Sequence, residues 1–241
     1  MNINERFFTL ENEPCVVHLS ERPNGFGILL LGDYNHFVDN GTSLWMQHEG
    51  KSKLLEGLLA KGYTIFTSNL YGRHWGNDQA VTLAKRLCHV VRKKEILNEK
   101  IHMIAEGMGA LVALQIMHYV PSTIRSVVML NPCLHLPRHM ELEKEHKFFY
   151  KRLMRELRSA YHSEYNTMED ISSKTFLKYP SKVPVKVLVP IHEKNERKKI
   201  IRDFEQFHSK TGEISLLFYF PESKYEMADT ISRFFRNNEK L

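Results

Sequence analysis

A chain of 241 residues with 42% hydrophobic and 26% charged residues has the composition of an ordinary globular protein, and we expect one domain over residues 1–241. No apolar run approaches the ~20 residues that a membrane-spanning helix needs, and residues 1–6 lack the apolar segment of a secretory signal. Three widely spaced cysteines argue against a disulfide framework, and no zinc-type Cys/His spacing is present. We therefore predict a cytoplasmic protein without a metal site or a cofactor.

Basic residues, which give the chain a net charge of +6, gather in runs at 92–94, 151–158 and 197–199. Such runs bind nucleic acid or anionic lipid when they form one surface. Each run also has Glu or Asp nearby, so we interpret the runs as solvated helix faces and expect no nucleic-acid partner. A basic surface for acidic polymers or membranes is the weaker alternative, and strong salt dependence of binding would be its signature.

The first part of the chain alternates between β-rich runs and turns. Residues 7–10 and 16–19 predict a β-hairpin. Residues 26–31 form a continuous apolar run, which is typical of a strand buried on both faces of a parallel sheet. This strand ends in a polar loop at 32–36, at the edge of the sheet where open α/β proteins bind their ligands.

Helices and strands then alternate. Apolar residues at helical spacing predict a helix over 52–61, and Gly62 ends it. Residues 63–67 predict the next strand. A loop at 68–77 leads to a helix over 78–96, for which we expect Asp78 to be the N-cap.

Residues 101–113 predict a buried strand, a glycine-rich turn and the start of an apolar helix, which should be buried because it is apolar nearly all round. A strand, a sharp turn and a helix form the nucleophile elbow of hydrolases, whose pattern is G-x-S-x-G. Here residues 105–109 read A-E-G-M-G, so Gly107 stands where the serine belongs.

A further strand is predicted over 125–130, after which the alternation is interrupted at about 132–182. We interpret this segment as a helical cap insertion, with one long amphipathic helix over 140–161. The alternation then resumes with strands over 185–191 and 214–220 and helices over 196–209 and from 225 onward.

This order of elements resembles the α/β-hydrolase family, a mostly parallel central sheet flanked by helices and carrying a cap, and in particular its lysophospholipase- and thioesterase-like esterases. Five stretches carry the resemblance, at residues 27–32, 58–65, 71–76, 101–113 and 183–189. Together they cover nearly the whole chain outside the cap. They predict the fold strongly and the activity weakly, because one fold serves many functions.

The resemblance implies three catalytic positions, and all three are degenerate. The nucleophile position is Gly107, which has no side chain to attack a carbonyl. The acid position falls on Asn195, which carries no charge, although a shift of the loop would bring Glu193 or Glu196 there. The base belongs in the loop at 221–225, where Lys224 stands in its approximate place and no histidine is present.

Other residues at the same edge of the sheet are candidates for a pocket without a nucleophile. Asp33, His36 and His74 should lie near Gly107, and either form a polar site or are ordinary loop residues. Glu106 and Met108 flank Gly107, although an elbow directs the side chain at position 106 away from the nucleophile.

Two further candidates have weaker support. Cys133 follows a strand end, and we expect a small buried residue there rather than a reactive thiol. His135 and His139 have the spacing of a metal pair, but we expect Pro137 to prevent the helix that this spacing needs.

We therefore expect a non-catalytic protein with the fold of a hydrolase, whose vestigial pocket binds a small ligand or a protein partner. The alternative is an esterase, lysophospholipase or thioesterase, or an enzyme with other chemistry in the same cleft. A carboxylate and an imidazole within ~3.2 Å of each other at the elbow would favour the enzyme.

Overall fold

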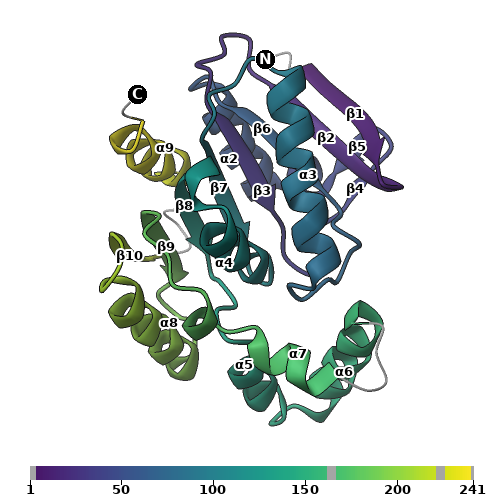
Figure 1. The fold of residues 1–241 in the computed structure, drawn as a ribbon, viewed down its shortest axis with the longest axis vertical. Coiled ribbons are helices and arrows are strands. Elements are labelled where there is room, and N and C mark those ends of the chain that lie inside the picture. Colours follow the sequence, from purple (N-terminus) through teal and green to yellow (C-terminus); the bar gives the residue numbers. More distant parts are fainter. Residues whose placement is uncertain (1–3, 162–166, 221–225, 240–241) are drawn as a thin grey trace.

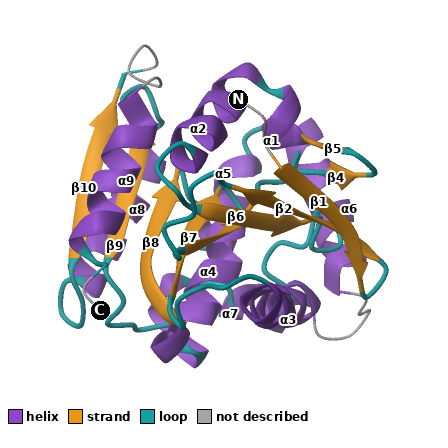
Figure 2. Ribbon diagram, turned by 90° about the horizontal axis from the view of Figure 1, so that it is seen from above, coloured by secondary structure: helices purple, strands orange, loops and turns teal. Residues whose placement is uncertain are grey.

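The computed structural model describes residues 4–161, 167–220 and 226–239. Eight strands form one twisted sheet in the order β1-β2-β6-β3-β7-β8-β9-β10 (Figure 2). The pairs β1–β2 and β2–β6 are antiparallel and the remaining pairs are parallel. The strand bounds are β1 Asn4–Leu10, β2 Glu13–Leu19, β3 Gly27–Leu31, β6 Thr64–Ser68, β7 Ile101–Glu106, β8 Ile124–Leu130, β9 Val185–Pro190 and β10 Ile214–Tyr219, with a separate small pair β4 Val38–Asp39 and β5 Thr42–Ser43.

Helices cover both faces of the sheet, and each face has its own apolar core. Residues of α2 and α9 pack on one face, and residues of α3, α4 and α8 pack on the other. The helix bounds are α1 Leu44–Gln47, α2 Glu49–Leu59, α3 Asp78–Lys94, α4 Gly109–Tyr119, α5 Leu136–Glu143, α6 Lys147–Tyr161, α7 Thr167–Ser173, α8 Asn195–His208 and α9 Met227–Asn237, with short 3₁₀ helices at Pro121–Thr123 and Phe176–Lys178.

The local patterns of the sequence correctly predicted most of these elements. The hairpin of β1 and β2 is confirmed, and its turn residues Glu11 and Asn12 have φ of 52° and 66°. Strand β3 is buried along its whole length, as its continuous apolar run predicts for the middle of a parallel sheet. Helix α4 is buried on nearly every side, which agrees with its all-round apolar sequence.

The prediction of one long helix over residues 140–161 is wrong. Helix α5 ends at Glu143 and α6 begins at Lys147, with a tight turn between them in which His146 N–H donates to Glu143 O (2.9 Å). Residues 143–147 are all charged or histidine, so no apolar side chain anchors a continuous helix to the protein at this point.

Two smaller expectations also need correction. Pro137 does not prevent a helix, because it lies in the first turn of α5, where its missing N–H costs nothing; His135 is the N-cap. The N-cap of α3 is Asn77 rather than Asp78, since the Asn77 side chain accepts the Ala80 N–H at 2.9 Å.

Helices α5, α6 and α7 lie together at one end of the sheet, apart from the helices on its two faces (Figure 1). They belong to the stretch between β8 and β9, and the three helices are called the cap below. None of the helices in the described part of the chain is long and apolar enough to cross a membrane.

Candidate functional site

The turn between β7 and α4 is centred on Gly107, which has φ of +50°. This left-handed conformation strains any residue with a Cβ. Two backbone hydrogen bonds hold the turn in place, from Gly107 N–H to Leu130 O (3.1 Å) and from Cys133 N–H to Gly107 O (2.8 Å). The turn therefore has the backbone of a nucleophile elbow and no side chain at its tip.

The space that a side chain at Gly107 would occupy is filled by the carboxylate of Asp33. A methyl group added at Gly107 would overlap the Asp33 carboxyl carbon and both of its oxygens. Asp33 comes from the loop after β3, the strand beside β7, so two neighbouring strand ends bring the residues together. The sequence placed both residues at this edge of the sheet but did not predict their contact.

Backbone amides bind the Asp33 carboxylate. The Met108 N–H donates to Asp33 Oδ1 at 2.9 Å, and the Tyr34 N–H is a second backbone donor to the same group. In hydrolases with a nucleophile elbow, the oxyanion is held by the N–H of the residue after the nucleophile and by an N–H from the loop after a neighbouring strand. The Asp33 carboxylate therefore accepts hydrogen bonds from the two backbone amides, Met108 and Tyr34, that occupy the positions of those donors.

Burial raises the pKa of Asp33 above its ordinary value, and the negative charge of Glu106 acts in the same direction. The hydrogen bonds from Met108 and Tyr34 and the positive charge of Lys51 oppose this shift. The group is therefore a carboxyl whose proton affinity is higher than that of an exposed aspartate.

A cavity of ≈ 530 Å³ lies between this elbow and helices α5 and α6. Its floor includes Asp33, Gly107 and Met108, and its walls carry charged, imidazole and aromatic side chains from the cap. The lining residues are Asp33, Tyr34, Trp75, Gly107, Met108, Asn131, Cys133, His139, Glu143, His146, Phe149, Arg152, Leu153, Glu156, Lys194 and Arg197. The volume is in the range of small-molecule sites.

The cap wall is organised around a second carboxylate, Glu156, which is buried with 6% exposure. The Trp75 indole N–H donates to it at 3.1 Å, and Arg73 and Arg152 pair with it at 2.7 and 3.3 Å. Arg152 also lies over the ring of Tyr34, 5.2 Å from its centroid. These contacts attach α6 to the loop after β6 and to the loop after β3.

The wall nearest α8 contains Arg197 and His139. Arg197 lies 3.1 Å from His139 Nδ1 and 3.9 Å from both Glu143 and Glu193. Burial, with the adjacent Arg197 charge, lowers the pKa of His139 to about 4. The neutral His139 imidazole stacks on the Trp75 ring with 5.4 Å between the ring centroids, and this contact connects α5 to the loop after β6.

Of the residues predicted to form a pocket, Asp33 and Met108 line the cavity, whereas His36 and His74 do not; His74 is buried and His36 is half-buried. His36 Nε2 lies 3.0 Å from Thr67 Oγ1, and His74 Nδ1 accepts the Gly76 N–H at 3.1 Å. Burial lowers the pKa of His36 to about 4 and that of His74 to about 3, so both are neutral at neutral pH.

The other predicted positions are placed as follows. Glu106 pairs with Lys51. Asn195 is exposed at the first residue of α8, and the neighbouring Lys194 lines the cavity instead. Lys224 and the rest of the loop at 221–225 fall outside the described residues.

Within the described residues, no histidine ring nitrogen lies within 4.0 Å of an Asp33 carboxylate oxygen; the His–carboxylate pairs are His18–Glu5 and His102–Glu239. The second pair forms a chain in which Ser126 Oγ lies 2.8 Å from His102 Nδ1 and Glu239 lies 3.5 Å from His102 Nε2. Ser126 and His102 are fully buried, so no substrate reaches them. His102 stacks on Phe235 at 4.2 Å, and the chain of contacts fastens α9 to the sheet.

Cys133 lines the cavity, and burial raises the pKa of its thiol to about 12, so it carries no reactive thiolate at neutral pH. The described residues contain no cluster of three or more His, Cys, Asp or Glu side chains arranged to hold a metal ion.

The sequence did not identify several residues of the site, among them Arg152, Glu156 and Arg197. One signal was available: Glu156 lies between Leu153 and Leu157 on the apolar side of its helix, where a carboxylate needs partners. Nothing in the sequence identified those partners, because Arg73 and Trp75 lie on a distant loop.

No family model matches the sequence, and no curated protein matches it. Solved structures match it over nearly its whole length at low identity. An esterase of Pyrococcus furiosus has 15% identity and a TM-score of 0.66, covering 99% of this chain and 92% of that one. An esterase of the bacterial hormone-sensitive lipase family has 13% identity and a TM-score of 0.69, covering 99% of this chain and 85% of that one.

A puromycin-hydrolysing peptidase of Mycobacterium tuberculosis has 12% identity and a TM-score of 0.75. The match covers 98% of this chain but 39% of the peptidase, so the chain spans about two fifths of that protein. These likenesses, with the strand order, confirm the predicted fold class of a mostly parallel sheet flanked by helices.

Proposed function

We propose that this chain, which has the α/β-hydrolase fold, is a non-catalytic protein that binds a small ligand in the cavity between the elbow and the cap. The observation that carries the proposal is the position of Asp33. Its carboxylate fills the place of the nucleophile side chain and accepts the Met108 N–H.

Acyl transfer at this site faces two obstacles. A carbonyl carbon above Gly107 meets no attacking side chain from the elbow, and its developing oxyanion would compete with Asp33 for the same amide. A fixed carboxylate beside that oxyanion would raise the energy of the transition state by repulsion between like charges.

The absence of a base supports the same conclusion. The sequence has no histidine after His208, which precedes β10, and His208 itself lies 2.9 Å from Val183 O in the interior. The proton transfers of a hydrolase therefore have no imidazole in the family's position.

Binding of a small ligand fits the cavity better than docking of a folded partner does. The cavity is concave and holds polar groups of both signs, including Asp33, Lys194 and Arg197. It also offers the aromatic surfaces of Tyr34, Trp75 and Phe149. A ligand with an apolar body and polar ends matches this lining.

One observation favours a second candidate. A carboxyl with a raised pKa at the floor of a cavity is the kind of group that serves as a general acid or base. An enzyme of ester or thioester hydrolysis would then depend on Asp33.

The test is a turnover screen with p-nitrophenyl butyrate, butyryl-CoA and lysophosphatidylcholine. The non-catalytic proposal expects the wild-type protein and Asp33→Asn to be equally inactive. Turnover that Asp33→Asn abolishes, with an unchanged far-UV circular dichroism spectrum, would replace the proposal with the enzyme.

Binding is measured separately with lysophosphatidylcholine below its micellar concentration. Trp75 lines the cavity while Trp45 lies in the core, so a Trp45→Phe background assigns the fluorescence change to Trp75. We expect a saturable change that Leu153→Arg, which fills the cavity, removes. A change that survives Leu153→Arg would place the ligand elsewhere and contradict the proposal.

A further inference from the structure

We propose that the outer face of α6 docks onto an anionic lipid surface. This inference is independent of the proposed ligand and of the question of catalysis. It rests on the charge of α6, on two exposed aromatic side chains and on the position of the helix at one end of the molecule.

Four cations share the outer face of α6. Lys147, Lys151, Arg155 and Arg158 are exposed, and their spacing of four, four and three residues puts them on one side of the helix. Among the described residues, none of the four takes part in an ion pair, whereas the inward-facing Arg152 does. The four charges therefore face solvent without compensation from the described part of the chain.

The structure weakens the reason for interpreting this run as an ordinary solvated face. That interpretation relied on acidic residues close to the basic ones; the exposed Glu145 precedes Lys147 in the turn before α6, but the acid within α6 is Glu156. Glu156 is buried and bound by Trp75, Arg73 and Arg152. The charged groups on the outer side of α6 are thus all cations.

Apolar groups accompany these cations. Phe148 is 74% exposed and Phe149 is 50% exposed, both in the first turn of α6. Farther along, Tyr150 and Met154 join Lys151, Arg155 and Arg158 around a shallow surface groove. Aromatic side chains beside a row of Lys and Arg are the composition of a helix that lies in a membrane interface.

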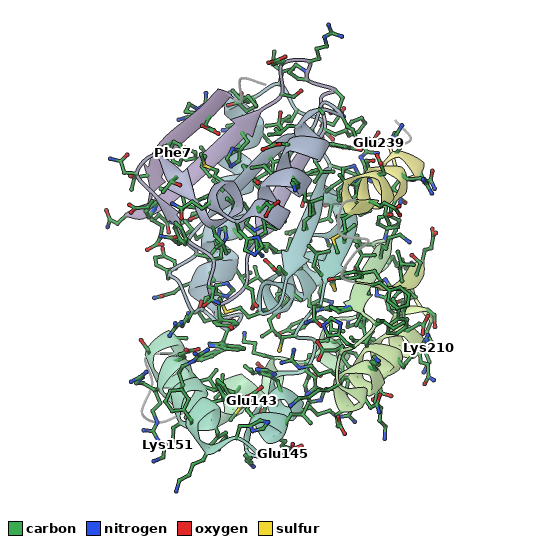
Figure 3. The ribbon with its side chains drawn as sticks, turned by 180° about the vertical axis from the view of Figure 1, so that it is seen from behind. Phe7, Glu143, Glu145, Lys151, Lys210 and Glu239 are labelled. Carbon is green, nitrogen blue, oxygen red and sulfur yellow. The ribbon has the colours of Figure 1, made fainter. Side chains whose placement is uncertain are left out.

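The two exposed phenylalanines favour a lipid surface over a nucleic acid as the partner of this face. A nucleic acid uses the cations alone and gains little from an aromatic pair at the end of the helix, whereas a bilayer accepts such side chains below its headgroups. The surface is also free to approach a plane, because α6 is at the end of the molecule. Figure 3 shows Lys151 on the outside of the cap, at the opposite end from Glu239.

Docking through this face would bring the cavity to the membrane. Phe149 lines the cavity and is half-exposed on α6, so the rim of the cavity and the docking face share a residue.

The experiment is co-sedimentation with 100-nm vesicles of phosphatidylcholine and phosphatidylglycerol at 7:3, in low salt, with pure phosphatidylcholine vesicles for comparison. We expect binding to the mixed vesicles that weakens as NaCl is raised. Lys151→Gln/Arg155→Gln should weaken it on the order of 30-fold, since each basic residue contributes about fivefold next to an anionic membrane. Phe148→Ser should weaken it by about tenfold through the loss of apolar burial.

The matched control is Lys85→Gln/Lys93→Gln, which removes the same charge from exposed positions on α3. We expect it to bind within about twofold of wild type, because its charges lie away from the docking face. Lys147→Gln/Arg158→Gln is a second pair on α6, and thermal melting verifies that each variant is folded.

Three outcomes would overturn the proposal: no binding of the wild-type protein to the mixed vesicles, equal losses in the α3 control, or vesicle binding that is indifferent to Phe148→Ser. In the last case, a fluorescent DNA duplex bound equally well by wild type and Phe148→Ser would identify the face as a general polyanion surface.

Discussion

The elbow and the cap each hold a carboxylate in the lining of the same cavity, but they bind it by different means. Asp33 is held by backbone amides of the elbow and of its own loop, whose positions the sheet fixes. Glu156 is held by the side chains of Trp75, Arg73 and Arg152. Changes in steric fit should therefore lower stability most at the elbow, whereas changes in side-chain charge should lower it most in the cap.

The largest effect should come from Gly107→Ala, which breaks the fit at the elbow. The added methyl group strains a backbone with φ of +50° and displaces Asp33 from its amide donors. We expect a loss of about 4 kcal/mol in the free energy of unfolding, measured by urea denaturation, from left-handed strain and lost charged hydrogen bonds.

Two variants separate those contributions. Gly72 has φ of +74° and no atom within 4 Å of an added Cβ, so Gly72→Ala should cost only about 1 kcal/mol of backbone strain. Asp33→Ala in the Gly107→Ala background should recover only the part of the difference that comes from the clash, because the Met108 N–H still lacks its acceptor. Equal costs for the two glycine variants would show that Asp33 does not compete for the space.

The next largest effect should come from Glu156→Ala in the cap. It leaves the Trp75 N–H without its acceptor and two arginines without their counter-charge, which should cost about 2 kcal/mol of stability. This expected cost in stability is below that of breaking a fully buried ion pair, because Arg73 is 44% exposed. Glu205→Ala breaks the exposed pair with Arg202 and should change stability by about 0.5 kcal/mol or less. Similar losses in both variants would mean that the Glu156 cluster does not anchor the cap.

The buried histidine behind the elbow should make stability depend on pH. The pKa of His74 falls from an unfolded value of 6.5 to about 3, so the unfolded state takes up a proton first as the pH decreases. The contribution of His74 is complete above pH 6.5 and is lost as the pH falls from 6.5 toward 3. Between pH 7 and pH 5 the loss amounts to about 2 kcal/mol.

His74→Asn keeps an acceptor for the Gly76 N–H and removes the titration. Urea unfolding at pH 7 and pH 5 should show a pH-dependent loss that is about 2 kcal/mol smaller in this variant. His48→Gln, at an exposed position, should keep the wild-type dependence. An unchanged dependence in His74→Asn would contradict its burial as a neutral imidazole.

The smallest effect should come from Asn77, which connects the N-terminus of α3 to α6 of the cap. Asn77 caps α3 by accepting the Ala80 N–H and donates to Ala160 O of α6 at 2.7 Å. Asn77→Ala should cost about 1.5 kcal/mol, whereas Asn77→Ser should retain the cap and cost about half of that. Hydrogen–deuterium exchange of the α6 amides should increase in both variants, because both lose the contact with α6. Protection equal to wild type would show that this contact does not hold the cap.

Sequence and structure agree best where a pattern is local and repeats. The continuous apolar run of β3 and the all-round apolar α4 identified their elements and their burial, because a core excludes water from every side chain in such a segment. The prediction of one long helix over 140–161 was wrong because helical spacing continues across the turn at 144–146, whose residues are all charged or histidine and give a continuous helix no apolar anchor.

By itself the sequence determined the chain order of the eight strands of the main sheet and of the five helices on its faces, the glycine at the tip of the elbow and the lack of a histidine after His208. These properties belong to single positions or to short repeating patterns. Only the tertiary structure decided that Asp33 fills the space above Gly107, 74 positions further along, and that Glu156 turns inward and leaves the cations of α6 on the surface. Such pairings depend on how distant segments pack, and residue type does not specify which of several cations or amides a carboxylate will meet.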